Sequence, residues 1–162
     1  MKKSIVLLTI FLILSGCSQM GNQPESNPAN DSVQKYLALA ENDSLDFKKR
    51  VQYNDKALSF IDLRRNDSLM IKNLYTVSYK YYAFNQAIPL KKTVDILLKK
   101  SKKINDSTGL GYYNRNIGLY YLLKSRNEKA IEHLFTAKKI FKSLKNEKYL
   151  NRVMLDILLS QS

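Results

Sequence analysis

This chain has little of what most catalytic chemistry requires. Among its 162 residues there is one cysteine, Cys17, and one histidine, His133. A single cysteine excludes an intramolecular disulfide and a paired-thiol redox site. No serine–histidine–acid set, group of metal-binding side chains or glycine-rich phosphate loop accompanies His133, which we expect on a helix surface or between helices. We therefore expect no enzyme activity, no metal and no cofactor.

Glycine and proline are also scarce, which leaves long stretches of the chain uninterrupted. Beyond Asn30 the sequence contains one proline, Pro89, and three glycines, Gly109, Gly111 and Gly118. Apolar residues in these stretches recur every three or four positions, as on one face of an α-helix, and do not alternate as in a β-strand. The sequence thus predicts an all-α fold.

Only one long apolar run is present, and it lies near the N-terminus. Residues 5–14 contain a single polar side chain, Thr9, and follow two lysines, Lys2 and Lys3. A basic start and a short apolar segment are typical of a secretory signal peptide, and the run is shorter than the about 18 residues that span a bilayer. We therefore predict that residues 1–16 are a signal peptide.

The four residues that end this segment resemble the lipobox of bacterial lipoproteins. They read Leu14-Ser15-Gly16-Cys17. The resemblance implies that the chain is cleaved before Cys17, that this cysteine is acylated, and that lipid anchors the protein to a membrane of the cell envelope. Ser18, in place of aspartate, favours the outer membrane, with the body in the periplasm or at the cell surface. An ordinary secretory cleavage site is the alternative.

A polar segment separates Cys17 from the helical part of the chain. Residues 18–30 contain two prolines, one glycine and few apolar side chains, which is typical of a disordered linker. We predict that residues 17–30 form a flexible tether, which as a coil holds the folded body on the order of 20 Å from the membrane. The folded domain is then residues 31–162.

The charge is strongly positive, at +13 for the whole chain and +11 once Lys2 and Lys3 are removed. Outside the cytoplasm this surplus favours anionic lipid headgroups, acidic glycans or acidic protein surfaces as partners, and not nucleic acid. Many of the lysines fall on two predicted helices, where they would form a positive convex ridge: Lys91, Lys92, Lys99, Lys100, Lys102, Lys103, Lys138, Lys139, Lys142 and Lys145. The alternative is that they only solvate the outer helix faces.

The tripeptide Asn-Asp-Ser recurs along the chain, at residues 30–32, 42–44, 66–68 and 105–107. Aspartate and serine are good helix N-caps, because their side-chain oxygens accept hydrogen bonds from the free amides of the first turn. Each tripeptide therefore predicts the start of a helix, and helix pairs repeated at such intervals are typical of an α-solenoid. The alternative is that these Asp-Ser pairs are O-glycosylated, since they also resemble an acceptor pattern of some secreted bacterial proteins.

The last full repeat resembles a known family. Residues 111–144 are similar to a tetratricopeptide repeat, whose pattern places small and large apolar residues at fixed positions in two antiparallel helices. The matching residues are Ile117, Gly118, Tyr121, Ala130, Leu134 and Ala137, whereas Asn114 and Lys142 replace the tryptophan and the proline of the pattern. Small residues at 118 and 130 let the two helices approach closely.

The rest of the chain divides into more degenerate units of the same kind. The resemblance implies a right-handed α-α superhelix, a TPR-like solenoid, of about three helix pairs and a terminal helix. We place the units at residues 31–65, 66–104 and 105–144, and the terminal helix at 146–160. In the first unit we expect the second helix at about 44–64, and in the second unit we expect helices from about 67 and 89.

In tetratricopeptide proteins the concave surface, lined by the first helix of each pair, usually binds peptides or partner segments. The resemblance therefore implies that the matching positions here form a partner-binding face: Lys72, Tyr75, Tyr79, Tyr82, Tyr112, Arg115, Leu119 and Leu122. Tyrosine and arginine suit recognition, because they combine a large contact area with polar tips. We expect the four tyrosines among them to be exposed in a groove, and packing between helices is the alternative.

These features together predict a membrane-anchored scaffold for protein–protein interaction at the bacterial cell envelope. The alternative is the extracytoplasmic sensor or ligand-binding module of a longer signalling protein. Tyrosine-rich repeats of this style resemble such modules, and the sequence stops soon after an apolar helix, at Ser162. A third hypothesis is the capture of a glycan or another small ligand in the groove.

Overall fold

The computed structural model of the protein describes residues 28–161. The predicted signal peptide, Cys17 and most of the predicted tether lie outside these residues. Helix α1 (Pro28–Glu41) begins at Pro28, so residues 28–30, which were expected to belong to the tether, are helical instead. Proline suits the first turn of a helix, because its missing amide has no helical partner there. Within the described residues, no helix has the length and apolar character needed to cross a membrane.

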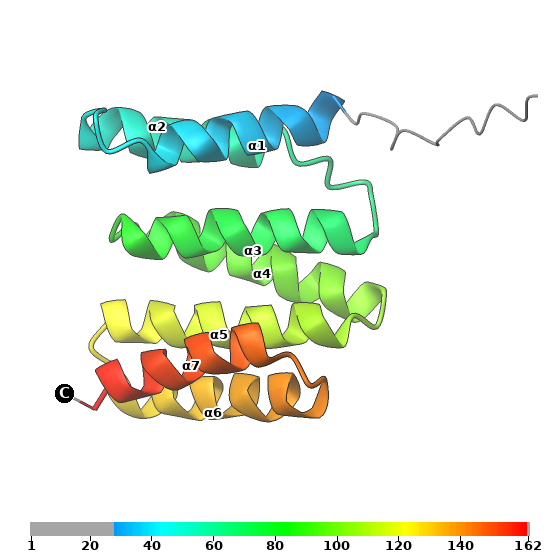
Figure 1. Cartoon of the computed structure of the whole chain (residues 1–162), viewed down its shortest axis with the longest axis vertical. Helices are drawn as coiled ribbons and strands as arrows, with labels where there is room; N and C mark the ends of the chain where they lie inside the picture. Colours follow the sequence, from blue (N-terminus) through cyan, green and yellow to red (C-terminus); the bar gives the residue numbers. More distant parts are fainter. Residues whose placement is uncertain (1–27, 162) are drawn as a thin grey trace, which may run out of the picture.

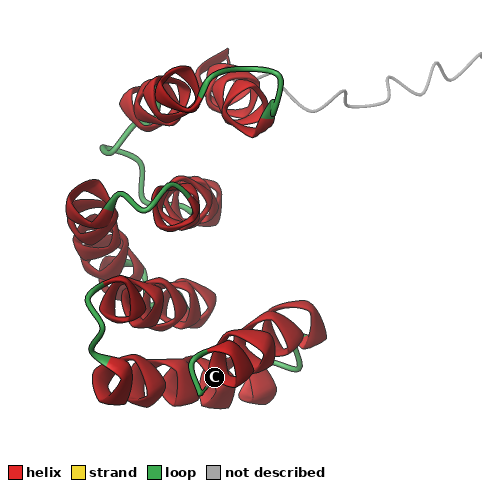
Figure 2. Cartoon of the chain, turned by 90° about the vertical axis from the view of Figure 1, so that its left-hand side faces the viewer, coloured by secondary structure: helices red, strands yellow, loops and turns green. Residues whose placement is uncertain are grey.

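The described residues form seven α-helices and no strand, which confirms the predicted all-α fold. After α1 they are α2 (Phe47–Ser59), α3 (Ser68–Ala83), α4 (Ala87–Lys103), α5 (Ser107–Leu123), α6 (Asn127–Ser143) and α7 (Glu147–Leu159). Figure 1 shows three antiparallel pairs, α1–α2, α3–α4 and α5–α6, stacked in chain order and followed by α7. Seen from the side, the stack is curved, and α7 leans across its open side (Figure 2). Consecutive helices pack on one another as in a helical-repeat solenoid.

From α4 onward the helices follow one another at a constant interval. Ala87, Ser107, Asn127 and Glu147 begin successive helices 20 residues apart, so that a helix pair takes 40 residues. This is longer than the about 34 residues of a tetratricopeptide repeat. Part of the added length lies in α5, which begins ahead of Gly111, where the matched segment starts.

The turns between these helices share one backbone geometry. The residue after each helix C-cap is left-handed, with φ between 52° and 54°, and none of the four is glycine: Asn85, Asn105, Ser125 and Lys145. In each turn the next amide donates to a carbonyl of the last helical turn, as Gln86 N does to Tyr81 O at 2.8 Å. These bonds satisfy carbonyls that a helix end would otherwise leave without a partner. A repeated turn geometry thus accompanies the constant interval.

The Asn-Asp-Ser motif caps a helix at two of its four positions. Asp67 accepts a hydrogen bond from Met70 N at 2.8 Å at the start of α3, and Asp106 accepts one from Gly109 N at 2.9 Å at the start of α5. The predicted role of these two copies is confirmed. Helix α4 begins ahead of the expected start at Pro89, which lies in its first turn.

The prediction is wrong for the other two copies of the motif. Residues 30–32 lie inside α1, and residues 42–44 lie in the loop before α2. In that loop the Asn42 side chain accepts hydrogen bonds from the amide and the hydroxyl of Ser44 at 3.0 and 2.7 Å, which closes a local turn. Asp46 caps α2 instead, and this helix ends at Ser59, so it is shorter than expected at both ends.

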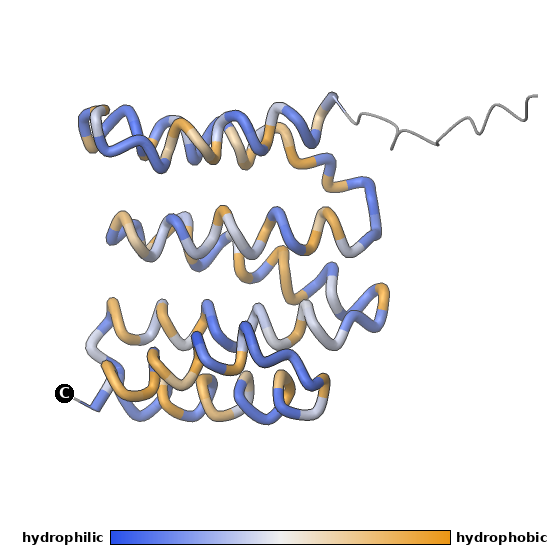
Figure 3. Tube along the Cα trace, in the orientation of Figure 1, coloured by the Kyte–Doolittle hydropathy of each residue, from blue (hydrophilic) through white to orange (hydrophobic). Residues whose placement is uncertain are grey.

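The core runs along the stack, with apolar residues recurring along each helix (Figure 3). Of the residues that match the repeat pattern, these are buried: Ile117, Gly118, Ala130, Leu134 and Ala137. A Cβ atom at Gly118 would lie 2.9 Å from Leu134 Cγ and 3.2 Å from Ala130 O, so α5 and α6 approach as closely there as the pattern implies. Tyr121 is half-buried, and its ring stacks on that of His133 at 5.5 Å.

The first helix pair is joined to the second by both apolar and polar side chains. Asn54 Nδ2 donates to Val77 O at 3.1 Å, and Lys80 Nζ lies 2.6 Å from Glu41 Oε1. Further hydrogen bonds across this interface join Gln34 to Asn73 and Tyr81 to Asp55. Helices α2 and α3 have the least contact of any two consecutive helices. The first pair is therefore the part of the stack that is least tightly attached.

Candidate functional site

The eight residues expected on the concave face divide into a buried group and a more open group. Between 1% and 6% of the surface is exposed in Tyr75, Tyr112, Arg115 and Leu119. Lys72 and Tyr79 are exposed, and Tyr82 and Leu122 are half-buried. The predicted exposure is therefore wrong for Tyr75 and Tyr112. The reason is α7, which packs across both rings.

Four aromatic rings fill the space between α3, α5, α6 and α7. Tyr75 of α3 stacks on Tyr112 of α5 with ring centroids 4.1 Å apart, and Tyr149 of α7 meets these two rings edge-on at 5.5 and 4.8 Å. Phe141 of α6 stacks on Tyr149 at 5.4 Å. Stacked and edge-on contacts are favourable geometries for aromatic rings. Tyr149 thus ties α7 to two earlier helices of the concave side.

Beside these rings, Arg115 of α5 forms an ion pair with Asp156 of α7. Arg115 Nε and Nη2 donate to the two carboxylate oxygens at 2.7 and 3.2 Å, and Nη1 donates to the Tyr75 hydroxyl at 2.7 Å. The side chains of Arg115 and Asp156 are only 3% and 12% exposed. Charged groups that are removed from water need such partners, because the loss of hydration alone costs about 5 kcal/mol per ion. The guanidinium is thereby fixed by α3, α5 and α7 together.

Burial also shifts the titration of the groups around this ion pair. Burial raises the pKa of the Asp156 carboxyl above its usual range, and the positive charge of Arg115 offsets part of that effect. Burial likewise raises the pKa of the Tyr75 hydroxyl and the pKa of the Tyr82 hydroxyl, so both stay protonated at neutral pH. His133 lies elsewhere, between α5 and α6, where burial lowers its pKa.

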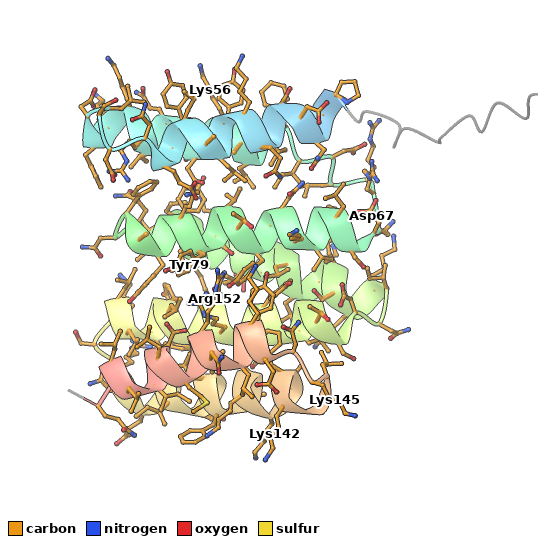
Figure 4. The ribbon with its side chains drawn as sticks, in the orientation of Figure 1. Lys56, Asp67, Tyr79, Lys142, Lys145 and Arg152 are labelled. Atoms are coloured by element: carbon orange, nitrogen blue, oxygen red, sulfur yellow. The ribbon has the colours of Figure 1, made fainter. Side chains whose placement is uncertain are left out.

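Next to the ion pair, α3, α5 and α7 enclose a hollow of about 290 Å³. Its lining consists of Tyr79, Tyr82, Arg115, Arg152, Leu155, Asp156 and Leu159. The Tyr79 ring lies 4.7 Å from the Arg115 guanidinium and 6.1 Å from the Tyr82 ring. Figure 4 locates Tyr79 on α3 and Arg152 on α7 at this place. We call this space the concave hollow.

The concave hollow offers apolar surface and positive charge side by side. Leu155 and Leu159 are 57% and 64% exposed, and Tyr79 is 37% exposed. Arg152 is also exposed, and its guanidinium lies 5.4 Å from the Tyr149 ring. Such a surface can receive an apolar side chain between rings and leucines and an acidic group near Arg152.

No residue of α7 was predicted for this site, and its aromatic and polar members there are Tyr149, Arg152 and Asp156. The sequence predicted only a terminal apolar helix at this place. A signal was nevertheless present, because the three residues are spaced at i, i+3 and i+7 and so share one face of the helix. A lone arginine at position 115, among apolar and aromatic residues of the preceding repeat, was the matching signal on α5.

The lysines of the predicted convex ridge differ in their environments. Lys91 Nζ lies 2.6 Å from Asp95 of the same helix, so its charge is partly compensated. The Lys100 ammonium donates to the backbone carbonyl of Leu63 and thereby holds the loop between α2 and α3. Lys139, Lys142 and Lys145 are exposed, and the last two are labelled at the lower edge of Figure 4. Lys92, Lys99, Lys102 and Lys103 are also exposed, so the charge available to a partner lies on both α4 and α6.

Metal chemistry finds no support in the part of the chain that the structure describes. No three or more histidine, cysteine, aspartate or glutamate side chains are grouped there so that they could hold a metal ion.

No protein-family model, curated protein or solved structure matches this chain. The similarity of residues 111–144 to a tetratricopeptide repeat therefore depends on the matching residues themselves, and the candidate site depends on its geometry.

Proposed function

We propose that this protein is a scaffold for protein–protein interaction, anchored by lipid on Cys17 to a membrane of a bacterial cell envelope. Its helical repeats hold a segment of a partner protein in the concave hollow. Residues 14–17, which resemble a lipobox, support the anchor. The open site between α3, α5 and α7 supports the binding role.

One observation carries the binding proposal: the concave hollow has a rigid floor and an exposed apolar rim. Arg115 forms the floor and is held by Asp156 and by Tyr75 from two other helices. A preformed site loses less conformational freedom when a partner binds. Exposed Tyr79 and Leu155 provide rim surface that a partner can bury.

The size of the concave hollow favours a peptide segment over a free small ligand. Sites for small molecules usually enclose about 300–1,000 Å³. The concave hollow, at about 290 Å³, lies just below this range and is open to solvent at its rim. It is large enough for one or two side chains of a longer segment that continues along the concave side. We expect that segment to carry an apolar residue and an acidic residue, the latter near Arg152.

Photo-crosslinking in living cells tests the binding role. Tyr79 is replaced by the photoreactive residue p-benzoylphenylalanine in the full chain, and irradiated cells are analysed for covalent adducts. Phe135 on α6 is the matched control, because it is 41% exposed and Tyr79 is 37% exposed. We expect a discrete protein adduct from position 79 and none of that mass from position 135.

A second variant separates specific capture from chance contact. Arg152→Glu reverses a charge at the exposed rim, and circular dichroism checks that the fold is retained. We expect it to abolish the adduct at position 79 by repelling an acidic partner residue. If position 79 gives no adduct, or the same adducts as position 135, the binding proposal is wrong.

The lipid anchor is tested independently of the partner. Cells are grown with radiolabelled palmitate, and the protein is isolated from the membrane fraction. We expect label in the unmodified chain and none in the Cys17→Ser variant. Equal label in both chains, or no label in either, would contradict the anchor.

A further inference from the structure

The outer side of the first helix pair carries an aromatic cluster at the surface. Tyr36 of α1 stacks on Tyr53 of α2 at 6.0 Å and on Phe60, just after α2, at 5.4 Å. Phe60 is 41% exposed, and both tyrosines are half-buried. Lys56 Nζ lies 5.5 Å from the Tyr36 ring and 5.8 Å from the Tyr53 ring. Figure 4 shows Lys56 on the edge of the molecule that faces away from α3.

Two more exposed lysines belong to the same surface. Lys49 precedes Lys56 by two helical turns and so lies on the same side of α2. Lys35 adjoins Tyr36 in α1, about 100° around the helix, and so lies at the edge of this surface. We call these six residues the outer tyrosine face: Lys35, Tyr36, Lys49, Tyr53, Lys56 and Phe60.

The carboxylates of the first pair mostly act elsewhere. Glu41 pairs with Lys80 of α3, and Asp55 accepts a hydrogen bond from the Tyr81 hydroxyl, so both are directed toward the second helix pair. Asp46 and Asp31 are exceptions, since Asp46 Oδ2 lies 3.7 Å from Lys49 Nζ and exposed Asp31 precedes Lys35 by one helical turn. The outer tyrosine face therefore combines exposed aromatic surface with an excess of positive charge.

The chain also places this face near the candidate anchor. Residues 18–27 separate Cys17 from the first residue of α1, Pro28. A coil of that length spans about 20 Å, and even a fully extended one spans only about 40 Å. With a lipid on Cys17, the first helix pair is thus the part of the folded body held closest to the membrane.

We propose that the outer tyrosine face lies against an anionic phospholipid surface and orients the solenoid on the membrane. This inference rests on the lipid anchor of the proposed function. Tyrosine rings favour the headgroup region of a bilayer, and lysines are attracted to anionic lipid within a Debye length. A second copy of the chain fits the face less well, because a two-fold contact would set its lysines against one another. The concave hollow is lined by α3, α5 and α7, so a contact through the first pair leaves it open to a partner.

Photo-crosslinking to lipid tests this orientation. Phe60 is replaced by p-benzoylphenylalanine in the full chain, and Phe135 serves as the control because both residues are 41% exposed. The lipidated proteins, purified from cells, are placed in vesicles of phosphatidylethanolamine and phosphatidylglycerol and irradiated. We expect phospholipid adducts from position 60 at several times the yield from position 135. Equal yields, or a cross-linked dimer of the chain from position 60, would overturn the proposal.

Charge reversal distinguishes this face from the lysines of α6. Lys35→Glu, Lys49→Glu and Lys56→Glu are combined in the chain that carries the photoreactive residue at position 60. The control combines Lys139→Glu, Lys142→Glu and Lys145→Glu, which changes the net charge equally at exposed positions. We expect the first set to lower the lipid adduct by at least about five-fold and the control to change it little. If the two sets lower it equally, or neither does, the outer tyrosine face is not the docking surface.

Failure of this orientation can be distinguished from failure of the proposed function. The mass of the purified chain reports whether Cys17 carries lipid, and the adduct at position 79 reports whether the concave hollow binds a partner. A lipidated chain that gives no phospholipid adduct at position 60 overturns only the orientation. A chain without lipid on Cys17 overturns the anchor, and with it the basis for this orientation.

Discussion

The two ends of the solenoid are attached to its middle in different ways. Between the first pair and α3 the contact is small and mixed, with the Phe47–Phe84 ring contact beside the buried polar groups of Asn54 and Lys80. At the other end α7 is joined to α3 and α5 by edge-on contacts of the Tyr149 ring and by the Arg115–Asp156 ion pair. The first connection consists of separate contacts, whereas the second consists of interlocked side chains from several helices.

This contrast matters because a repeat protein is stabilised mainly by contacts between neighbouring units. A weak interface lets one unit open while the others stay folded. Helices α3 to α7 should therefore behave as one block that keeps the concave hollow in shape. The first pair should behave as a separate unit, which suits the proposed contact of this pair with a membrane surface.

The largest expected effect comes from breaking the ion pair. Arg115→Met leaves the Asp156 carboxylate nearly buried without its cation, and we expect a loss of about 3–5 kcal/mol in the free energy of unfolding. Urea denaturation followed by circular dichroism measures it. The double variant Arg115→Met with Asp156→Leu is the control, because replacing both charges should restore most of the stability. A single variant as stable as the unmodified chain would contradict the role of this pair.

A smaller loss is expected when the aromatic contact of α7 is removed. Tyr149→Ala deletes a ring that touches Tyr75, Tyr112 and Phe141. We expect this to lower the free energy of unfolding by about 2–3 kcal/mol. Fluorescence-monitored unfolding in urea measures it. Tyr36→Ala in the first pair is the comparison, since Tyr36 is also half-buried but stacks on two rings only. The account predicts the smaller loss for Tyr36→Ala, and the reverse order would count against it.

A matched pair of buried asparagines lies at the interface of the first pair and inside the block, between α3 and α5. Asn54 donates to Val77 O and Asn116 donates to Tyr75 O, and the side-chain oxygen of each is buried without a hydrogen-bond partner. We expect Asn54→Ala to cost about 1 kcal/mol and to speed amide exchange in α1 and α2 alone. Asn116→Ala should instead lower the stability of the whole block. If Asn54→Ala speeds amide hydrogen exchange equally in all helices, the first pair does not open separately from α3 to α7.

The smallest effect concerns the left-handed turns of the block. Lys145 has φ of 52°, a conformation that costs a non-glycine residue about 1–2 kcal/mol. Lys145→Gly should therefore stabilise the protein, by about 0.5–1 kcal/mol once the greater flexibility of unfolded glycine is counted. Asn85→Gly is the control and should gain less, because asparagine tolerates this conformation. Thermal unfolding of both variants measures the difference, and a destabilised Lys145→Gly chain would contradict it.

Local features of the fold could be predicted from the sequence because they depend on neighbours in the chain. The three-and-four spacing predicted helices, the aspartates at 67 and 106 predicted caps, and Gly118 predicted a close helix contact. The Asn-Asp-Ser copies at 30 and 42 do not start helices as predicted, since the same tripeptide also fits inside a helix or in a turn.

The candidate site was predicted only in part, because its burial depends on a helix that is distant in the chain. Tyr75 and Tyr112 have the spacing of exposed groove residues, but α7 packs Tyr149 against both. The curvature that brings α7 to α3 cannot be read from the repeat pattern of α3 or α5. Tyr79 and Tyr82 lie further along α3 and line the concave hollow.

Native-state hydrogen exchange tests most directly whether the molecule consists of a first pair and a block. The free energy of opening is measured for individual amides of the full chain at increasing denaturant concentration. The account predicts that amides of α1 and α2 open together, at a free energy about 2 kcal/mol or more below that of α3 to α7. A single opening free energy shared by all seven helices, or an early opening of α7 alone, would contradict it.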